Sequence, residues 1–254
     1  MKKLIPALCM LLVAAALLGT STFAWFSMST SVEAGGMQVK ATASKNLLIS
    51  LSESSGYGSG VTLPINNTTM TPVSTTGGDV VAPVFSKLNV AGSMSQDSYA
   101  TAGDTTMQAA VEGTDYAKTT VYLKVVGQTG QNLKAAISAT NGGEKNIDKA
   151  LRVMLVDKTD PSAVKTYIFM PVTGAEYGTS GKAIESLDGS NKGVLGNITT
   201  IKDGDDILIA SMTADTVYKF DVYVWYEGED KSCTAANTVD MATTTLGITF
   251  SIAS

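Results

Sequence analysis

The sequence contains no histidine among its 254 residues, and this absence restricts the chemistry available to the chain. Imidazole shuttles the proton in Ser-His-Asp and Cys-His arrangements, so nucleophilic catalysis of those kinds is excluded. The zinc motif HExxH is excluded too, because its two imidazoles bind the metal. Paired carboxylates of the glycosidase kind need no histidine. Because the absence of histidine excludes the other catalytic and metal-binding arrangements named above, we expect a protein that is not an enzyme and that holds no cofactor and no metal.

Cysteine is nearly absent as well. Cys9 lies in the N-terminal apolar run, and Cys233 is the one other cysteine, so the chain after that run cannot form an internal disulfide. Two interpretations of Cys233 remain: a buried small hydrophobic residue, or a thiol that pairs between chains. We favour the first, because free cysteine is among the most buried residue types.

Positive charge is scarce. The chain has 18 lysines and arginines against 23 aspartates and glutamates, and Arg152 is its single arginine. Two lysines and no acids lie in residues 1–24, so the net charge of −5 becomes −7 for residues 25–254. Nucleic-acid phosphates repel so acidic a chain, and clusters of basic residues that hold anionic membranes are missing. We expect neither nucleic acid nor, after processing, a membrane as partner.

The N-terminus has the order of a secretory signal. Two lysines precede an apolar run over residues 4–18, and small residues follow up to Ala24. This order predicts a signal peptide over residues 1–24, with signal peptidase cleavage between Ala24 and Trp25. The apolar run has about 15 residues, whereas a membrane span needs roughly 20. An uncleaved membrane anchor is the alternative, but we expect a secreted protein of the extracellular matrix or cell surface.

The rest of the chain is rich in Thr, Ser, Gly, Val and Ala, and many short segments alternate between apolar and polar residues. Such alternation is typical of strands that cover a core with one face. The pattern predicts an all-β fold: an antiparallel β-sandwich of jelly-roll type over residues 37–254, with one helical turn at 146–151. The expected strands are 37–43, 47–51, 119–126, 133–139, 151–156, 164–170, 206–210, 217–226 and 246–252.

Two stretches interrupt this regular pattern. Residues 52–116 and 174–202 are polar and rich in Gly, Ser, Thr and Asn. Long segments without regular structure are uncommon inside compact domains unless they bind something or move. We interpret both as loop-rich insertions into a single sandwich and not as further domains.

The segment 217–226 alternates almost without interruption. One face, expected to lie on the core, carries Tyr218, Phe220, Val222, Val224 and Tyr226. The opposite face carries Val217, Lys219, Asp221, Tyr223 and Trp225. Tyr223 and Trp225 are suited to stacking on sugar rings. The alternative, which we favour, is that a loop or a second sheet covers this face.

Acidic residues gather in two turns. Oxygen ligands suit Ca²⁺, although neither turn has the spacing of an EF-hand loop. A solvated acidic turn is the simpler interpretation, and we favour it for both. The two clusters are Glu227, Glu229 and Asp230, and Asp203, Asp205 and Asp206.

The region around the cleavage position carries a family resemblance. Phe23-Ala24 is followed by Trp25-Phe26 within the sequence GTSTFAWFSMSTSVEAGGMQVKA. This arrangement resembles the start of the TasA/camelysin family of exported Gram-positive proteins. Near the C-terminus, VYVWYEGEDKSC and LGITFSIAS are similar to clostridial members. The middle of the chain shows no such resemblance.

The resemblance implies a jelly-roll domain, cleavage by a SipW-type signal peptidase, and a homopolymeric fibre of a biofilm matrix. In such fibres the new N-terminal segment of one subunit adds a strand to the next. Residues 25–36 are the candidate donor here, with apolar Trp25, Phe26, Met28 and Val32. We expect the regular last strand to leave an open edge, which is a template for another strand. Alternatively, the segment packs on its own domain.

Two other functions remain open. The first is a monomeric surface adhesin or carbohydrate-binding β-sandwich that uses the loops at one end. The second is the metalloprotease activity that the camelysin resemblance implies. That activity is disfavoured here, because catalytic zinc sites usually include a histidine.

Overall fold

The computed structural model describes residues 39–44, 46–65, 70–75, 83–88, 107–144, 146–171, 201–202, 206–228, 230, 232–233 and 237–253. The predicted signal peptide, residues 1–24, and the candidate donor, residues 25–36, lie outside these ranges. Within them, no helix has the length and apolar character needed to cross a membrane.

The first large sheet, called sheet A here, has five strands. Neighbouring strands within sheet A are antiparallel, except that β1 and β14 run parallel to each other, with Val39 opposite Leu246. In spatial order the strands are β12 (Ile207–Met212), β8 (Gln131–Asn141), β14 (Thr244–Ala253), β1 (Val39–Ala43) and β3 (Gly60–Leu63).

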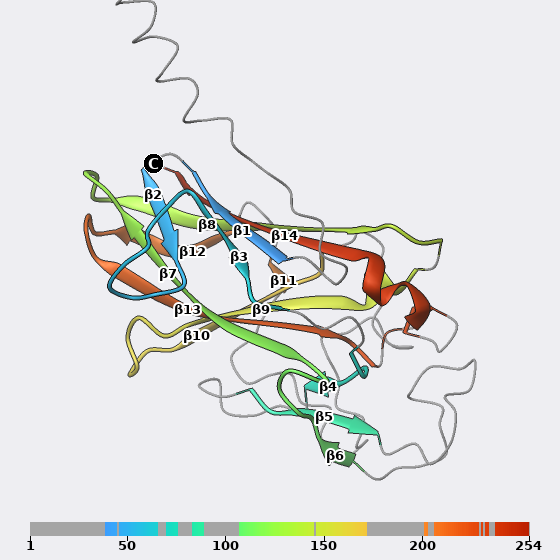
Figure 1. The fold of residues 1–254 in the computed structure, drawn as a ribbon. Coiled ribbons are helices and arrows are strands. Elements are labelled where there is room, and N and C mark those ends of the chain that lie inside the picture. The colour runs from blue at the N-terminus through green and yellow to red at the C-terminus, as the bar shows by residue number, and fades with distance from the viewer. Residues whose placement is uncertain are drawn as a thin grey trace, which may run out of the picture. The chain divides into compact units, whose positions relative to one another are not determined.

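The second large sheet, sheet B, has six strands and is also mainly antiparallel. In order they are β11 (Ile201–Lys202), β10 (Lys165–Phe169), β9 (Leu151–Asp157), β13 (Val217–Tyr226), β7 (Ala117–Val125) and β2 (Leu47–Ser50). A separate three-stranded sheet contains β4 (Ser74–Thr75), β5 (Phe85–Leu88) and β6 (Met107–Ala109). Figure 1 shows the two large sheets and the small one.

Sheets A and B pack face to face around one apolar core. Alternate residues of each strand point inward, as the burial pattern of β14 shows. The ring of Phe220 in sheet B lies 6.2 Å from the ring of Phe250 in sheet A. The prediction of an all-β, antiparallel-rich sandwich is confirmed; its assignment to the jelly-roll type stays a prediction.

Each segment expected to be a strand contains one, with ends that differ by a few residues. The helical turn expected at 146–151 is the 3-10 helix η2 (Ile147–Ala150). A second one, η3 (Thr238–Thr243), precedes β14. The segment 52–116 holds more structure than expected, because β3 joins sheet A and β4, β5 and β6 form the small sheet. These strands have two to four residues, too few for alternation to reveal them.

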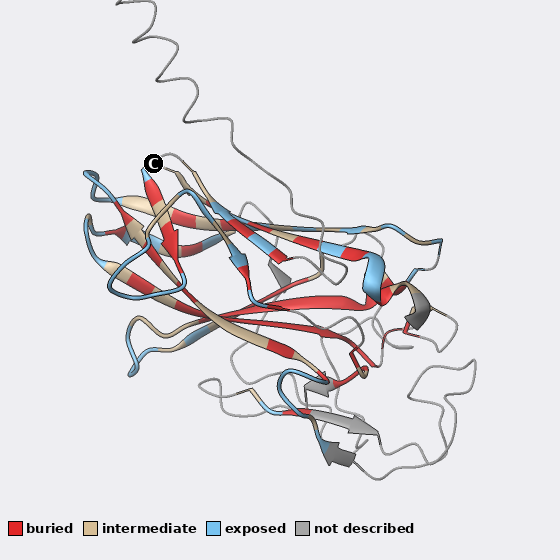
Figure 2. Ribbon diagram, viewed as in Figure 1, coloured by how far each residue is buried: buried red, intermediate tan, exposed pale blue. Residues whose placement is uncertain are grey.

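The central strands of sheet B are buried on both faces, and in Figure 2 they are almost entirely red. One face of β13 meets sheet A, as predicted for the side that carries Phe220. The other face packs on a second cluster that includes Phe85 of β5 and Val73. Figure 2 also shows exposed positions that alternate with buried ones along the strands of sheet A.

The last strand does not lie at an edge. β14 is paired with β8 on one side and with β1 on the other, so the prediction that it leaves an open edge is wrong. Alternation reports which face of a strand is buried and carries no information about its neighbours in the sheet. In the described part of the sandwich, the edge strands are β3, β12, β2 and β11.

Candidate functional site

The residues predicted to form the cleavage and assembly site are Ala24, Trp25, Phe26, Met28 and Val32, and all of them lie outside the described residues. Apart from Asp206, which directly precedes β12, the other predicted groups that the structure describes lie on or just after β13. The structure places them in three environments: a buried ion pair beyond the end of the strand, an aromatic cluster on its outer face, and a carboxylate near its middle.

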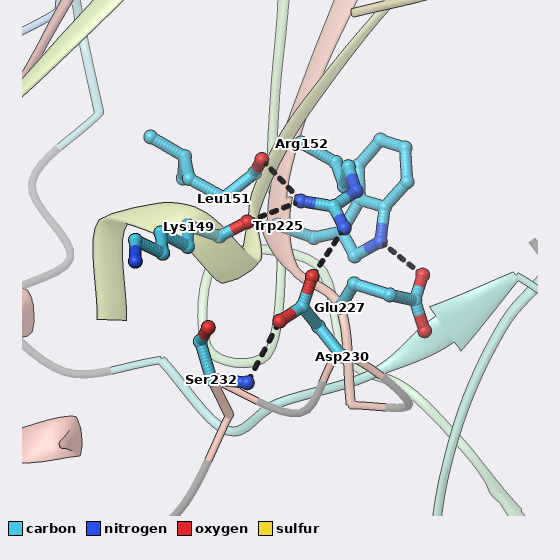
Figure 3. A network of polar contacts seen from close by, with 7 residues as sticks. All are labelled: Lys149, Leu151, Arg152, Trp225, Glu227, Asp230 and Ser232. Carbon is cyan, nitrogen blue, oxygen red and sulfur yellow. Dashed lines mark hydrogen bonds and ion pairs between the residues drawn. The ribbon is translucent and has the colours of Figure 1, made fainter. Parts of the chain in front are cut away.

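A buried polar cluster, the Arg152 cluster, joins sheet B to the turn after β13. It consists of Arg152, Trp225, Glu227 and Asp230 (Figure 3). Arg152 lies on β9 directly opposite Trp225 on β13, so strand register brings the guanidinium to the end of β13. All four side chains belong to residues that are fully buried.

Directed hydrogen bonds hold the guanidinium of Arg152. Its Nη2 lies 2.6 Å from Oδ2 of Asp230 and forms an ion pair in which neither side chain is exposed. Its Nη1 donates to the backbone oxygen of Lys149 at 2.7 Å and to that of Leu151 at 2.9 Å. Charge-assisted hydrogen bonds of this kind are stronger than neutral ones, and they hold η2, β9 and the turn together.

The two carboxylates of the cluster also organise the turn. Glu227 accepts from Nε1 of Trp225 at 3.0 Å, and the second oxygen of Asp230 accepts from the backbone N–H of Ser232 at 2.8 Å. The backbone N–H of Glu227 donates to the oxygen of Ala150 at 2.8 Å. Both acidic side chains therefore have defined protein partners.

The preferred interpretation of this turn as solvated is wrong for Glu227 and Asp230, since both residues are fully buried. Glu229 lies outside the described residues, as do Asp203 and Asp205 of the other acidic turn. The missed signal was Arg152 itself: the single arginine of the chain stands within an apolar strand segment, and a charge there requires a buried partner. Without access to solvent, the cluster is suited to fixing the turn and not to catalysis.

Cys233 follows the cluster and is a free cysteine with no exposed surface. The prediction of a buried small hydrophobic residue is confirmed. Its backbone N–H donates to the oxygen of Asp230 at 2.8 Å. Burial, followed by the nearby negative charges of Glu227 and Asp230, raises the pKa of the thiol.

An aromatic cluster covers the outer face of β13. The ring of Phe85 lies 5.2 Å from that of Trp225 and 5.8 Å from that of Tyr223, and it stacks at 4.3 Å on Tyr116. Trp225 has no exposed surface and Tyr223 retains only 4%. Stacking of sugar rings on these two residues is therefore contradicted, and the prediction that the face is covered is confirmed.

Asp221 is buried near the middle of β13, on the face opposite that of Phe220. It is fully paired: Nζ of Lys158 lies 2.8 Å from Oδ2, Nζ of Lys118 lies at 3.8 Å, and Oγ1 of Thr120 donates to Oδ1 at 2.7 Å. Burial raises the pKa of Asp221, but the hydrogen bonds from Lys158 and Thr120 and the two lysine charges together lower it below its usual range.

The described residues contain no group of three or more histidine, cysteine, aspartate or glutamate side chains that would hold a metal ion. Comparisons with known proteins add no identification: no family model, no curated protein and no solved structure matches the chain.

Proposed function

We propose that this chain is a secreted structural subunit of an extracellular fibre or biofilm matrix. In this proposal, a signal peptidase cuts between Ala24 and Trp25, and residues 25–36 then add a strand to an adjoining copy. The support comes from the signal-like order of the first 24 residues, the resemblance of the cleavage region to the TasA/camelysin family, and the sandwich fold.

The observation that carries the proposal is the place of β1 in sheet A. β1 begins at Val39, separated by two residues from the end of the candidate donor, and it is already paired with β14 on one side and β3 on the other. A segment that precedes Val39 therefore has no vacant position beside β1 in its own sheet. To form strand hydrogen bonds, residues 25–36 need an edge strand.

The four edge strands differ in how well they would accept a partner. β2 is occupied beyond its pairing with β7, because Ile49 exchanges two backbone hydrogen bonds with Gly58, at 2.8 and 3.0 Å. β12 has two register shifts along its pairing with β8, and β11 has only two residues. Bulges and short length both discourage pairing at an edge. β3 pairs regularly with β1, and it is the edge that we assign to the incoming strand.

The donor sequence suits a position at such an edge. In an extended strand, Phe26, Met28 and Val32 point to one side, and Ser27 and the other intervening serines point to the opposite side. An incoming strand with this pattern would place Phe26, Met28 and Val32 toward the core of the adjoining sandwich, and Trp25 and the serines on its other side.

The test uses the processed protein, collected from the medium of producing cells, with substitutions on the two sides of the donor. Phe26→Asp combined with Val32→Asp places charges on the apolar side, and Ser27→Asp combined with Ser31→Asp is the matched control with the same change in charge. We expect the first pair to leave single subunits by analytical ultracentrifugation and the second to retain fibres in electron micrographs.

Fibres of normal length and yield from the Phe26→Asp, Val32→Asp protein would overturn the proposal. So would an unmodified processed protein that folds residues 25–36 back onto its own sandwich. Crosslinking between a cysteine introduced at Ser29 and one introduced at Thr62 of β3 separates the two arrangements, because pairing between copies gives a ladder of covalent oligomers and pairing within one copy gives crosslinked monomers.

A further inference from the structure

The outer face of sheet A has a charge distribution unlike that of the chain as a whole. Its five strands contain no aspartate and no glutamate, and their charged residues are Lys40 and Lys134. The whole chain carries 23 acidic residues against 18 basic ones. The strands of this face offer a negatively charged group two lysines and no acidic side chain, so charge complementarity points to an anionic ligand.

This face is hollowed between β1, β14 and β8. The hollow has a volume of about 340 Å³ and is lined by Lys40, Ser138, Thr140, Thr245, Leu246 and Gly247. Strand register explains the gathering of these residues, because Gly247 lies opposite Lys40 on one side and opposite Ser138 on the other. Thr245 lies opposite Thr140 in the same way, and its hydroxyl donates to the backbone oxygen of Thr140 at 3.4 Å.

Gly247 is what keeps the hollow open. It lies at the centre of the three strands, where every other residue of β14 on this face has a side chain. A Cβ at this position would lie 3.2 Å from Oγ of Ser138, closer than ordinary contact, so even an alanine would push into the hollow. Small hydroxyl side chains surround it and leave room for an occupant above the sheet.

The lining identifies the chemistry of that occupant. Serine and threonine hydroxyls both donate and accept hydrogen bonds, and the ammonium group of Lys40 provides donors only. Among the described residues, no aromatic side chain lines the hollow, whereas the centres of protein–protein interfaces are enriched in aromatic residues. A polyhydroxylated ligand that carries an acidic group fits these donors better than a protein surface does.

We propose that the hollow binds a uronic acid unit of an acidic polysaccharide. The ammonium group of Lys40 pairs with the carboxylate of the sugar, and the hydroxyls of Ser138, Thr140 and Thr245 bond to its ring hydroxyls. The exposed, small-residue strand face on either side lets an extended polymer continue across the sheet. The site lies on the face of sheet A and not at its edge, so it does not depend on strand addition.

The test measures binding of the purified protein to polygalacturonate by affinity gel electrophoresis, with fully methyl-esterified polygalacturonate as the uncharged probe. Lys40→Glu reverses the charge in the hollow and should weaken binding by about tenfold. Lys165→Glu makes the same change at an exposed lysine of β10 in sheet B and should leave binding unchanged. Gly247→Ala fills the hollow without altering charge and should also weaken binding, while circular dichroism confirms that the variant is folded.

Four results would overturn the proposal. The first is unchanged binding by the Lys40→Glu protein, and the second is an equal loss in the Lys165→Glu protein, which would indicate a general charge effect. The third is equal binding of the methyl ester, which would show that no carboxylate is recognised. Tighter, Lys40-dependent binding of polyphosphate than of polygalacturonate would reject the uronic acid as the ligand.

Discussion

Arg152 and Asp230 form an ion pair from which solvent is fully excluded, with 2.6 Å between Nη2 and Oδ2. The pair connects β9 in sheet B to the turn that follows β13. Isolated buried charges are costly, so each member depends on the other and on the surrounding hydrogen bonds. The turn after β13 is acidic in sequence, but its residues Glu227 and Asp230 are buried, and Asp230 attaches the turn to β9 through Arg152.

Replacement of Asp230 by alanine should therefore destabilise the fold severely. The change leaves the Arg152 guanidinium buried with one carboxylate fewer, and breaking such a pair typically costs about 3–5 kcal/mol. Urea denaturation followed by tryptophan fluorescence measures the loss. Replacing both residues by leucine should cost less than the single change, and a double variant no more stable than the Asp230→Ala protein would contradict this account.

Asp221 should make the stability of the protein sensitive to acid. Its pKa is lowered in the folded state, so its contribution is complete above the ordinary aspartate pKa of 3.8 and is lost as the pH falls through the lowered value. The free energy of unfolding should therefore decrease more steeply between about pH 5 and pH 2 for the native protein than for Asp221→Asn. Parallel pH profiles of the two proteins would show that Asp221 has no such role.

Tyr167 should produce the opposite dependence at alkaline pH. Its hydroxyl donates to the backbone oxygen of Leu208 at 2.5 Å, and burial, with a smaller effect of Asp157, raises its pKa from 10.0 to about 12. The stabilisation is present below pH 10 and is lost as the pH rises toward 12, because the unfolded chain ionises first. Comparing the native protein with Tyr167→Phe by denaturation at pH 8 to 12 checks this; an equal alkaline loss in both would rule it out.

Cys233 should be unreactive in the native protein. Its thiol is buried and its pKa is raised, so the nucleophilic thiolate is scarce and inaccessible. A thiol reagent such as Ellman's reagent should modify the leader-free protein slowly without denaturant and at once in urea. Rapid modification of the folded protein, or a covalent dimer through Cys233 in fibres, would restore the interpretation as a pairing thiol.

Most of the sandwich was predictable because its long strands alternate in sequence. The segment 217–226 has the same bounds in the structure as in the prediction, and its Phe220 face lies on the core. The opposite face was harder to assign, since a buried Asp221 becomes plausible only when its partners are known. Thr120 lies on β7 and Lys158 directly follows β9, and both are far from Asp221 in sequence.

Sheet order and tertiary pairing were not predictable in the same way. The parallel contact between β1 and β14 joins the two ends of the domain, and no local pattern reports it. The Arg152 cluster was not predictable for the same reason, because 78 positions in the sequence separate Arg152 from Asp230. The hollow beside Lys40 also depends on strand order, since its lining residues come from three strands that are distant in sequence.

The central claim, assembly by the segment that cleavage releases, is tested most directly by sedimentation velocity on the processed protein over a wide range of concentrations, with the leader-bearing chain as control. The account predicts that the processed protein forms long polymers and that the leader-bearing chain does not. A processed protein that sediments as a single subunit at the highest concentration would contradict it.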